Sequence, residues 1–220
     1  KINILGNNVT REEVIRNNFL VDEGDAFNEL LQTRTLNNLR ALNFFSNVES
    51  EILDIENENK KIINITVTEK PTGEIMAGAG VGTNGGTVAF GVSENNFLGR
   101  GIEFTSDISI DANKLKGIIS MNNPNYKGSN KSLNASLESL ITDRLTNFGY
   151  KSNKTGFTLG SGFEFYDDLY WNTGISTYVE KLETDSTASA SMKKQEGSYF
   201  DTFFNHTLSY DKRNQRYKTS

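Results

Sequence analysis

The sequence predicts a small α+β domain over residues 1–70, followed over residues 71–220 by the antiparallel, all-β strands of a membrane β-barrel. Three observations predict this arrangement. Strand and helix signals follow the order β-α-α-β-β in the first seventy residues. A glycine-rich stretch then covers residues 71–101, and a regular alternation of apolar and polar residues begins at Gly101.

The first part opens with a short strand and two helices. Ile2, Ile4 and Leu5 form the strand, and Gly6 ends it. Thr10-Arg11-Glu12-Glu13 has the pattern of a capping box, so we expect Thr10 to cap a short helix. Asp25 is the expected cap of a second, longer helix. The buried stripe of that helix recurs near the helical period: Phe27, Leu31, Leu36, Leu39 and Leu42.

Two strands complete the small domain. They are expected over Val48–Ile55 and Lys61–Thr68, with Asn57-Glu58-Asn59 as the hairpin turn. In the second strand Ile63, Ile65 and Val67 share one face, which we expect to be buried.

Eight strands are expected in the second part, each of about nine to eleven residues, the length a tilted membrane strand needs. The first covers Glu74–Gly82 and ends in a tight connection at Thr83–Gly86. Later strands place apolar residues on one face and polar residues on the other. The apolar set includes Ile102, Phe104, Ile119, Leu133, Leu137, Phe157, Leu159, Trp171, Ile175, Phe200, Phe204 and Leu208.

A soluble sheet would alternate too, but three features favour a membrane. Aromatic residues cluster near strand ends, and the polar face carries charges and glycine, as a lumen would. Connections are also expected to alternate in length, with short turns on the periplasmic side and long loops outside. The short turns are Asn95–Gly101, Asn123–Asn130 and Tyr166–Leu169. The longer connections are Asp111–Lys114, Asp143–Asn153 and Leu182–Glu196.

Composition excludes several classes of protein. The chain has no cysteine, which excludes disulfides and thiolate chemistry. A net charge of −5 argues against a nucleic-acid partner. Neither a secretory signal nor a closing element is visible at the ends, so we expect the chain to be an internal piece of a longer precursor.

Candidate chemistry in the sequence has simpler explanations. His206 lies near Ser209 and next to Asn205, but it shares the face of Phe204 and Leu208, so we expect a surface residue rather than a lipase-like catalyst. A strand rather than a helix follows Gly78–Gly82, which argues against a phosphate loop. The turn residues Asp167 and Asp168 are expected to be solvated. The loop residues Asp111, Asn113, Asp143 and Asp185 could contact a cation, but their spacing is not that of a calcium site. We therefore expect no enzyme activity, no cofactor and no metal.

The first seventy residues resemble the POTRA domain. Three stretches support this resemblance: Ile2-x-Ile4-x-Gly6-Asn7, Leu39–Val48 with its Leu-x-x-Leu-x-Phe-Phe-x-x-Val pattern, and Val67-Thr68-Glu69-Lys70. The middle pattern is the most specific, because it fixes both a helix end and the entry of the next strand. The alternative is an unrelated α+β domain with an amphipathic helix.

Three turns extend the resemblance to BamA-type outer-membrane assembly factors. Glu94–Gly101 looks like their Asn-x-Leu-Gly-x-Gly turn, Asn122–Tyr126 like their Asn-Pro-x-Tyr turn, and Tyr210–Tyr217 like their Tyr-Asp-x-Arg turn. The residues that carry these matches are Asn95, Leu98, Gly99, Gly101, Asn123, Pro124, Tyr126, Asp211, Arg213 and Tyr217. The resemblance implies the last POTRA domain and the first half of a sixteen-stranded barrel.

By this resemblance the protein would insert client β-barrel proteins into the bacterial (Gram-negative) outer membrane, with its POTRA domain in the periplasm. Its first strand would open sideways as an edge that pairs with client strands. That edge consists of Glu74, Ile75, Met76, Ala77, Gly78, Ala79, Gly80, Val81 and Gly82. Implied partners are outer-membrane lipid, unfolded clients and accessory periplasmic lipoproteins.

Other functions remain open at this point. A two-partner-secretion pore or an autotransporter-assembly pore of the same superfamily would share these motifs. A passive structural or adhesive β protein would share the alternation alone. The glycines between Gly73 and Gly86 weaken the first strand, which suits an opening edge; the alternative is that they only relieve crowding where the barrel curves.

Overall fold

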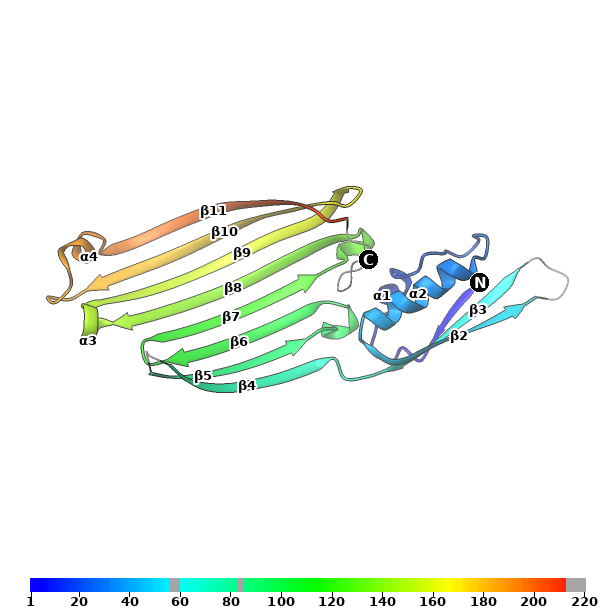
Figure 1. Cartoon of the computed structure of the whole chain (residues 1–220), viewed down its shortest axis with the longest axis horizontal. Helices are drawn as coiled ribbons and strands as arrows, with labels where there is room; N and C mark the ends of the chain where they lie inside the picture. Colours follow the sequence, from blue (N-terminus) through cyan, green and yellow to red (C-terminus); the bar gives the residue numbers. More distant parts are fainter. Residues whose placement is uncertain (56–59, 83–84, 213–220) are drawn as a thin grey trace. The chain divides into compact units, whose positions relative to one another are not determined.

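The computed structural model of the chain describes residues 1–55, 60–82 and 85–212, and all structural statements below refer to these residues (Figure 1). The chain divides into two compact units. The N-terminal unit contains Lys1–Gly73 together with Glu94–Glu103, and the sheet unit contains Glu74–Ser93 and the chain from Phe104 onward. Among the described residues, no helix combines the length and the apolar character needed to cross a membrane.

The N-terminal unit is a three-stranded sheet with two helices. Strand β3 (Lys61–Glu69) lies in the middle, with β1 (Ile2–Leu5) parallel to it on one side and β2 (Phe45–Asp54) antiparallel on the other. Helices α1 (Glu12–Arg16) and α2 (Glu29–Ala41) complete the order β-α-α-β-β, as predicted. The turn expected at 57–59 lies outside the described residues.

The core of this unit forms between the helices and one face of the sheet. Its largest fully buried apolar side chains are Ile15 of α1, Leu39 of α2, Val48 of β2 and Ile65 of β3. The alternation in β3 buries Ile63, Ile65 and Val67, as expected.

The predicted helix caps are wrong at both helices. Arg11, not Thr10, is the N-cap of α1, and no side chain caps that helix. Asn28, not Asp25, caps α2, because its side chain accepts hydrogen bonds from the backbone N–H groups of Leu30 and Leu31. The Asp25 carboxylate instead accepts from the backbone N–H of Asp22. At the first helix the Thr10 hydroxyl is used by a distant residue, Asn96, and at the second the cap lies three residues later in the chain than the pattern placed it.

The sheet unit contains the eight expected strands, arranged in chain order from β4 to β11 (Figure 1). Their bounds are β4 (Gly73–Gly82), β5 (Gly85–Glu94), β6 (Glu103–Asp111), β7 (Lys114–Asn123), β8 (Lys131–Arg144), β9 (Tyr150–Tyr166), β10 (Leu169–Thr184) and β11 (Gly197–Tyr210). Short helical segments interrupt the connections: η1 (Phe97–Gly99), η2 (Tyr126–Gly128), α3 (Leu145–Phe148) and α4 (Ala190–Lys194).

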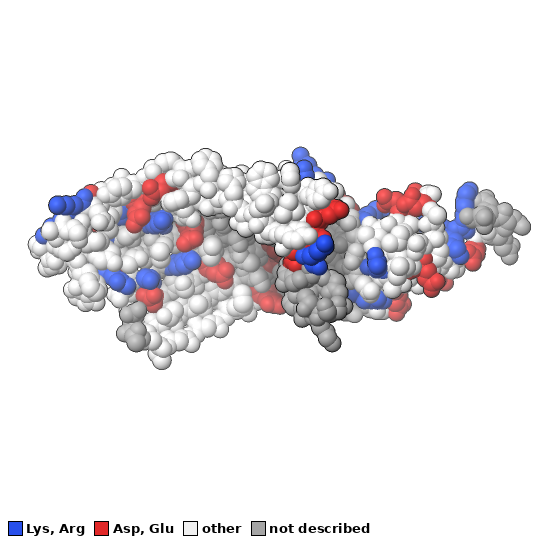
Figure 2. Space-filling model, turned by 45° about the horizontal axis from the view of Figure 1, so that its top comes forward, with Lys and Arg blue, Asp and Glu red and all other residues white. Residues whose placement is uncertain are grey.

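The register separates two faces across β7 to β11. Ser136 lies opposite Ser120 and Thr158, and Thr158 lies opposite Ser176; we call the face with these residues the polar face. Leu159 lies opposite Ala135 and Ile175 on the other, apolar face. Figure 2 shows charged side chains in the hollowed part of the surface and a broad area without charges along its upper margin. The predicted alternation is confirmed.

Two expectations about lengths are wrong. Strands β8 to β11 have 14, 17, 16 and 14 residues, longer than expected, because their ends continue pairing through charged residues such as Asp143 opposite Lys151. The connections do not alternate cleanly either. Only residues 112–113 separate β6 from β7, whereas residues 95–102 and 124–130 separate the strands at the other end. The tight connection expected at Thr83–Gly86 lies partly outside the described residues.

We name the two ends of the sheet by their connections. The turn end holds residues 95–102, 124–130 and 167–168. The loop end holds residues 112–113, 145–149 and 185–196. A backbone hydrogen bond joins the loops at 145–149 and 185–196: the N–H of Asp185 donates to the carbonyl of Gly149 at 2.8 Å.

Candidate functional site

Strand β4, the predicted client-pairing edge, stands at one end of the strand order. Its neighbour in the sheet is β5, and no other described strand lies beside it. All ten residues of β4 are exposed, with Ile75 at 75% and Val81 at 95%. A strand in this position presents a row of backbone N–H and C=O groups along its outer edge.

Glycines give β4 an unusually bare surface. A Cβ atom placed on Gly78, Gly80 or Gly82 would meet nothing within 4 Å. Gly117 of the inner strand β7 shares this open space, but other glycines inside the sheet do not, because neighbouring side chains already fill the space above them. The ring of Tyr178 lies over Gly156, and the amide of Asn134 lies over Gly160. The β4 glycines therefore serve no packing contact among the described residues.

The polar side of β4 is marked by Met76. A Cβ atom on Gly91 of β5 would meet the Asp107 carboxylate, and the Met76 methyl group at 3.3 Å, so these residues share a face. By alternation Gly78, Gly80 and Gly82 lie on this same face, and Ile75, Ala77, Ala79 and Val81 lie on the other.

The turn at 95–102 is the second predicted feature, and it belongs to the N-terminal unit. The backbone N–H of Asn95 donates to the carbonyl of Thr72 at 3.3 Å. The Glu94 carboxylate accepts from the Thr72 hydroxyl and from the backbone N–H of Asn96. The backbone N–H of Arg11 donates to the carbonyl of Gly99 at 2.8 Å.

Backbone geometry explains two glycines in this turn. Gly99 has φ +68° and Gly101 has φ +63°, in the left-handed region that favours glycine. A Cβ on Gly99 would overlap the carbonyl oxygen of Val9, and one on Gly101 would lie 3.0 Å from Cγ1 of Val14. Leu98 also has φ +55°, and its side chain is exposed.

A chain of buried polar groups joins this turn to the rest of the unit. The Asn96 amide donates from Nδ2 to the Thr10 hydroxyl at 2.8 Å, and the two residues are 6% and 2% exposed. The Thr10 hydroxyl in turn donates to the Glu69 carboxylate. That carboxylate also accepts from the backbone N–H groups of Asn8, Val9 and Thr10 at 3.0, 2.9 and 2.6 Å.

These contacts set the charge state of Glu69. Burial raises the pKa of the carboxyl, but the hydrogen bonds from Thr10, Val9 and Asn8 outweigh burial and hold the pKa below its usual value. Glu69 is therefore an anion at neutral pH. The sequence did not indicate that Thr10, Glu69 and Asn96 form a group, since Glu69 lies 59 positions and Asn96 lies 86 positions after Thr10.

The second turn, at 124–130, repeats the conformation of the first. Leu98 and Gly99 have φ +55° and +68°, and Lys127 and Gly128 have φ +54° and +67°. The Asn96 side-chain oxygen accepts from the backbone N–H of Gly101 at 2.8 Å, and that of Asn125 accepts from Asn130 at 3.0 Å.

Surroundings distinguish the two turns. The predicted residues Asn123, Pro124 and Tyr126 are sequence neighbours of Asn125. The side-chain oxygen of Asn123 accepts from the backbone N–H of Asn125 at 3.1 Å. Tyr126 is exposed, and so is the rest of η2. The same turn is thus docked on a domain in one place and exposed in the other.

The third predicted turn is only partly described. The backbone N–H of Asp211 donates to the carbonyl of Asp168 at 2.9 Å, which joins the ends of two connections at the turn end. Arg213 and Tyr217 lie outside the described residues.

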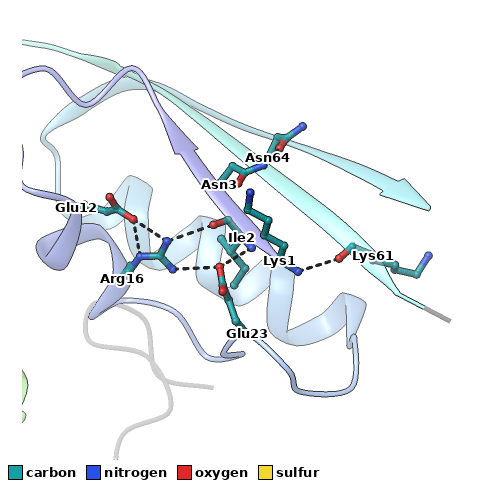
Figure 3. A network of polar contacts seen from close by, with 8 residues as sticks. All are labelled: Lys1, Ile2, Asn3, Glu12, Arg16, Glu23, Lys61 and Asn64. Carbon is teal, nitrogen blue, oxygen red and sulfur yellow. Dashed lines mark hydrogen bonds and ion pairs between the residues drawn. The ribbon is translucent and has the colours of Figure 1, made fainter. Parts of the chain in front are cut away.

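A network that the sequence did not indicate joins β1 to helix α1 and to the connection that follows this helix (Figure 3). Arg16 contacts the Glu12 carboxylate at 2.6 Å, donates to the carbonyl of Ile2 at 3.2 Å and lies 3.8 Å from Glu23. Glu23 accepts from the backbone N–H of Ile2 at 2.9 Å, which lowers the pKa of its carboxyl. Across the sheet, Asn3 donates to Asn64 at 2.8 Å. These contacts hold the edge strand β1 in register.

The candidate chemical groups have structural partners. His206 contacts the Thr173 hydroxyl at 2.9 Å on the apolar face, opposite to the side of Ser209 in β11. Asp111, Asp143 and Asp185 each accept a backbone N–H two residues later, so they cap their own turns. Within the described ranges, no three His, Cys, Asp or Glu residues lie together as metal ligands would.

The fold and its turns define a class: an outer-membrane β-barrel protein that carries a POTRA domain. Residues 1–70 match the POTRA family model, described as a surface antigen variable number repeat. Residues 96–220 match the Omp85 superfamily domain, which is more than half of the chain. The chain therefore belongs to the Omp85 superfamily.

Curated relatives named outer membrane protein assembly factor BamA are similar in sequence. One from Nitratidesulfovibrio vulgaris is 24% identical over 90% of this chain and 25% of its own length. One from Neorickettsia risticii is 26% identical over 96% of the chain and 29% of its length. The chain thus spans roughly a quarter of these relatives.

Solved structures show the same fold. BamA from Haemophilus ducreyi, solved without POTRA domains 1–3, matches with a TM-score of 0.80 at 20% identity, covering 99% of this chain and 45% of that one. CdiB from Escherichia coli matches with a TM-score of 0.57 at 13% identity, covering 94% and 41%.

Proposed function

We propose that the protein to which this chain belongs folds and inserts other β-barrel proteins into the outer membrane, with β4 as the edge that pairs with client strands. The bare edge of β4 carries this proposal. It has one strand neighbour among the described residues, and three glycines on one face meet open space. Backbone pairing along such an edge gives affinity that does not depend on client side chains.

The names of the BamA relatives support the same function, since they are assembly factors of outer-membrane proteins. In this proposal the protein is not an enzyme. Its turn end and N-terminal unit face the periplasm, where unfolded clients and accessory lipoproteins would meet them, and its apolar face contacts outer-membrane lipid.

Disulfide mapping tests the edge. Single cysteines replace Ile75, Met76, Ala77 and Gly78 in a full-length protein that has no other cysteine, and single cysteines are placed along the last strand of a stalled client. Directly opposite residues of an antiparallel pair are close enough for a disulfide. We expect an antiparallel register: when the cysteine in β4 moves one residue toward the C-terminus, the client position that crosslinks with it should move one residue toward the N-terminus.

Ala135→Cys is the matched control for Ala77→Cys. Both change alanine on the apolar face, but Ala135 lies in β8 between β7 and β9. Clients that insert without any crosslink to β4 would contradict the edge proposal.

A secretion pore, the rival suggested by the fold shared with CdiB, predicts a different pattern. An exported polypeptide would crosslink to polar-face positions such as Ser136 and Thr158 without a register along β4.

A further inference from the structure

We propose that Asn96, Thr10 and Glu69 form a latch that makes the turn at 94–103 a working part of the POTRA domain, so that the domain and this turn move as one body during client insertion. The functional half of this inference rests on the proposed function. The structural half rests only on contacts within the N-terminal unit.

The latch is a directed chain of hydrogen bonds. The Asn96 amide donates to the Thr10 hydroxyl at 2.8 Å, and this hydroxyl donates to the Glu69 carboxylate. Three backbone N–H groups, those of Asn8, Val9 and Thr10, hold the same carboxylate. Each donor strengthens the next acceptor in such a chain, and the anion at its end makes the bonds charge-assisted.

Two further contacts make the fit specific to this turn. The carbonyl of Gly99 accepts from the backbone N–H of Arg11 at 2.8 Å. Gly99 and Gly101 lie so close to Val9 and Val14 that a side chain at either position would collide or crowd them. A surface turn with no docking role would not need this closeness.

The exposed second turn shows what the docked turn adds. Asn96 and Asn125 hold the same internal hydrogen bond through their side-chain oxygens, to Gly101 and Asn130. Among the described residues, Asn96 uses its amide nitrogen for a contact with another element, the Thr10 hydroxyl, and Asn125 does not. The amide nitrogen is therefore unnecessary for the turn itself.

The latch would give the POTRA domain a second connection to the membrane strands. The chain already links the domain to β4 through residues 70–73. The latch also attaches the turn between β5 and β6 to the domain. Both strands of the first hairpin, β4 at its first residue and β5 at its last, are therefore attached to the domain at the turn end. Movement of the domain would then act on the hairpin that contains the proposed edge.

Asn96→Asp in the full-length protein tests the latch. The change keeps the oxygen that accepts from Gly101, but it replaces the donor to Thr10 with an oxygen that bears charge close to Glu69. We expect amide hydrogen exchange at Arg11 to become faster by roughly tenfold or more, as the loss of a buried hydrogen bond predicts. The assembly of clients in cells that depend on this protein should fall several-fold.

Asn125→Asp is the matched control. It makes the same change in the same turn conformation, and we expect both exchange at Arg11 and client assembly to stay as in the wild type. Thr10→Val should reproduce the effect of Asn96→Asp, and Thr10→Ser, which keeps the hydroxyl, should not.

A covalent latch tests whether the two parts move together. A Cβ at position 101 would lie 3.0 Å from Val14 Cγ1, where the sulfur of a cysteine at position 14 would lie, so Val14→Cys with Gly101→Cys should form a disulfide. We expect the disulfide to restore assembly in the Thr10→Val variant and to leave assembly unchanged when the latch is intact. Gly101→Cys alone controls for strain at φ +63°.

Each result decides the proposal. Unchanged exchange at Arg11 in Asn96→Asp would overturn the latch itself. Faster exchange at Arg11 with normal client assembly in Asn96→Asp would overturn the role of the latch in insertion. The same role would be overturned if Asn125→Asp lost as much client assembly as Asn96→Asp, or if the disulfide between positions 14 and 101 blocked assembly. If the wild-type protein inserts no clients, the proposed function fails while the exchange result still decides the latch.

Discussion

Glycine residues of the sheet unit meet two kinds of surroundings. In β9, Gly156 lies beneath the ring of Tyr178. Lys154 Nζ lies 4.5 Å from the centroid of this ring, and the centroid of the Phe203 ring lies 6.0 Å from it. In β4, Gly80 faces open space. The first glycine is needed for packing, and the second only reduces the strand preference of the backbone.

This difference predicts opposite effects of the same substitution. Gly156→Ala should destabilise the full-length protein by about 1–3 kcal/mol, because the new Cβ would overlap the Tyr178 ring and lie 2.8 Å from the carbonyl of Thr177. Gly80→Ala should stabilise it by about 0.5–1 kcal/mol. Unfolding in urea measures both, and equal costs would contradict the open surroundings of Gly80.

Glu69 predicts a pH dependence for the N-terminal unit. Its pKa in the folded protein lies below the usual value of 4.5, so its contribution to stability is present above that value and is lost as the pH falls through the lowered pKa. Glu69→Gln should therefore destabilise the unit at neutral pH, and the difference from wild type should shrink in acid. Native-state hydrogen exchange measures both stabilities. A difference that stays constant from about pH 7 to pH 3 would show that Glu69 does not titrate in this way.

Single residues were the hardest part to predict from sequence. Thr10 fits a helix-capping pattern, yet its hydroxyl lies between Asn96 and Glu69. Asn28 caps the second helix, because Phe27 first packs against the core and the helix begins only after it. Contacts between distant residues decide such cases, and no local pattern contains them.

At the scale of elements, the strands followed from the sequence with few errors. Alternation has a period of two in any half-exposed strand, so it survives without knowledge of the neighbours. Strand ends were less predictable. Asp143, Lys151 and Glu183 continue the pairing of β8, β9 and β10 beyond the apolar stripe, with Asp143 and Lys151 at 3.4 Å. Polar residues that pair across strands look like loop residues in a single sequence.

The two faces of the strands predict unequal tolerance of charge. Leu137→Arg should cost about 2–4 kcal/mol, since Leu137 lies in the middle of the apolar face, and Ser136→Arg on the polar face should cost much less. Folding of the two full-length variants into lipid vesicles measures the difference. Equal costs on the two faces would indicate that the apolar face does not contact lipid.

For the whole molecule, the proposed orientation can be tested by labelling. Ser191 lies in α4 at the loop end, and Ser129 follows η2 at the turn end. On intact cells, Ser191→Cys in the full-length protein should react with an impermeant maleimide, and Ser129→Cys should react only after the outer membrane is opened. The opposite pattern would invert the orientation. Loop length is a poor guide here, since the turn at 95–102 is longer than the connection at 112–113.

The order in which the chain is made gives the N-terminal unit an unusual path to completion. Strand β1 comes first in the sequence but pairs with β3, about sixty residues later. The turn at 94–103 belongs to the same unit, although residues 74–93 of the sheet unit lie before it in the sequence. Contacts between such distant segments form late, because closing each loop costs chain entropy before any contact repays it. The POTRA domain therefore reaches its final form only after its own chain has supplied the first membrane hairpin, and a piece cut at residue 73 would fold without its last part.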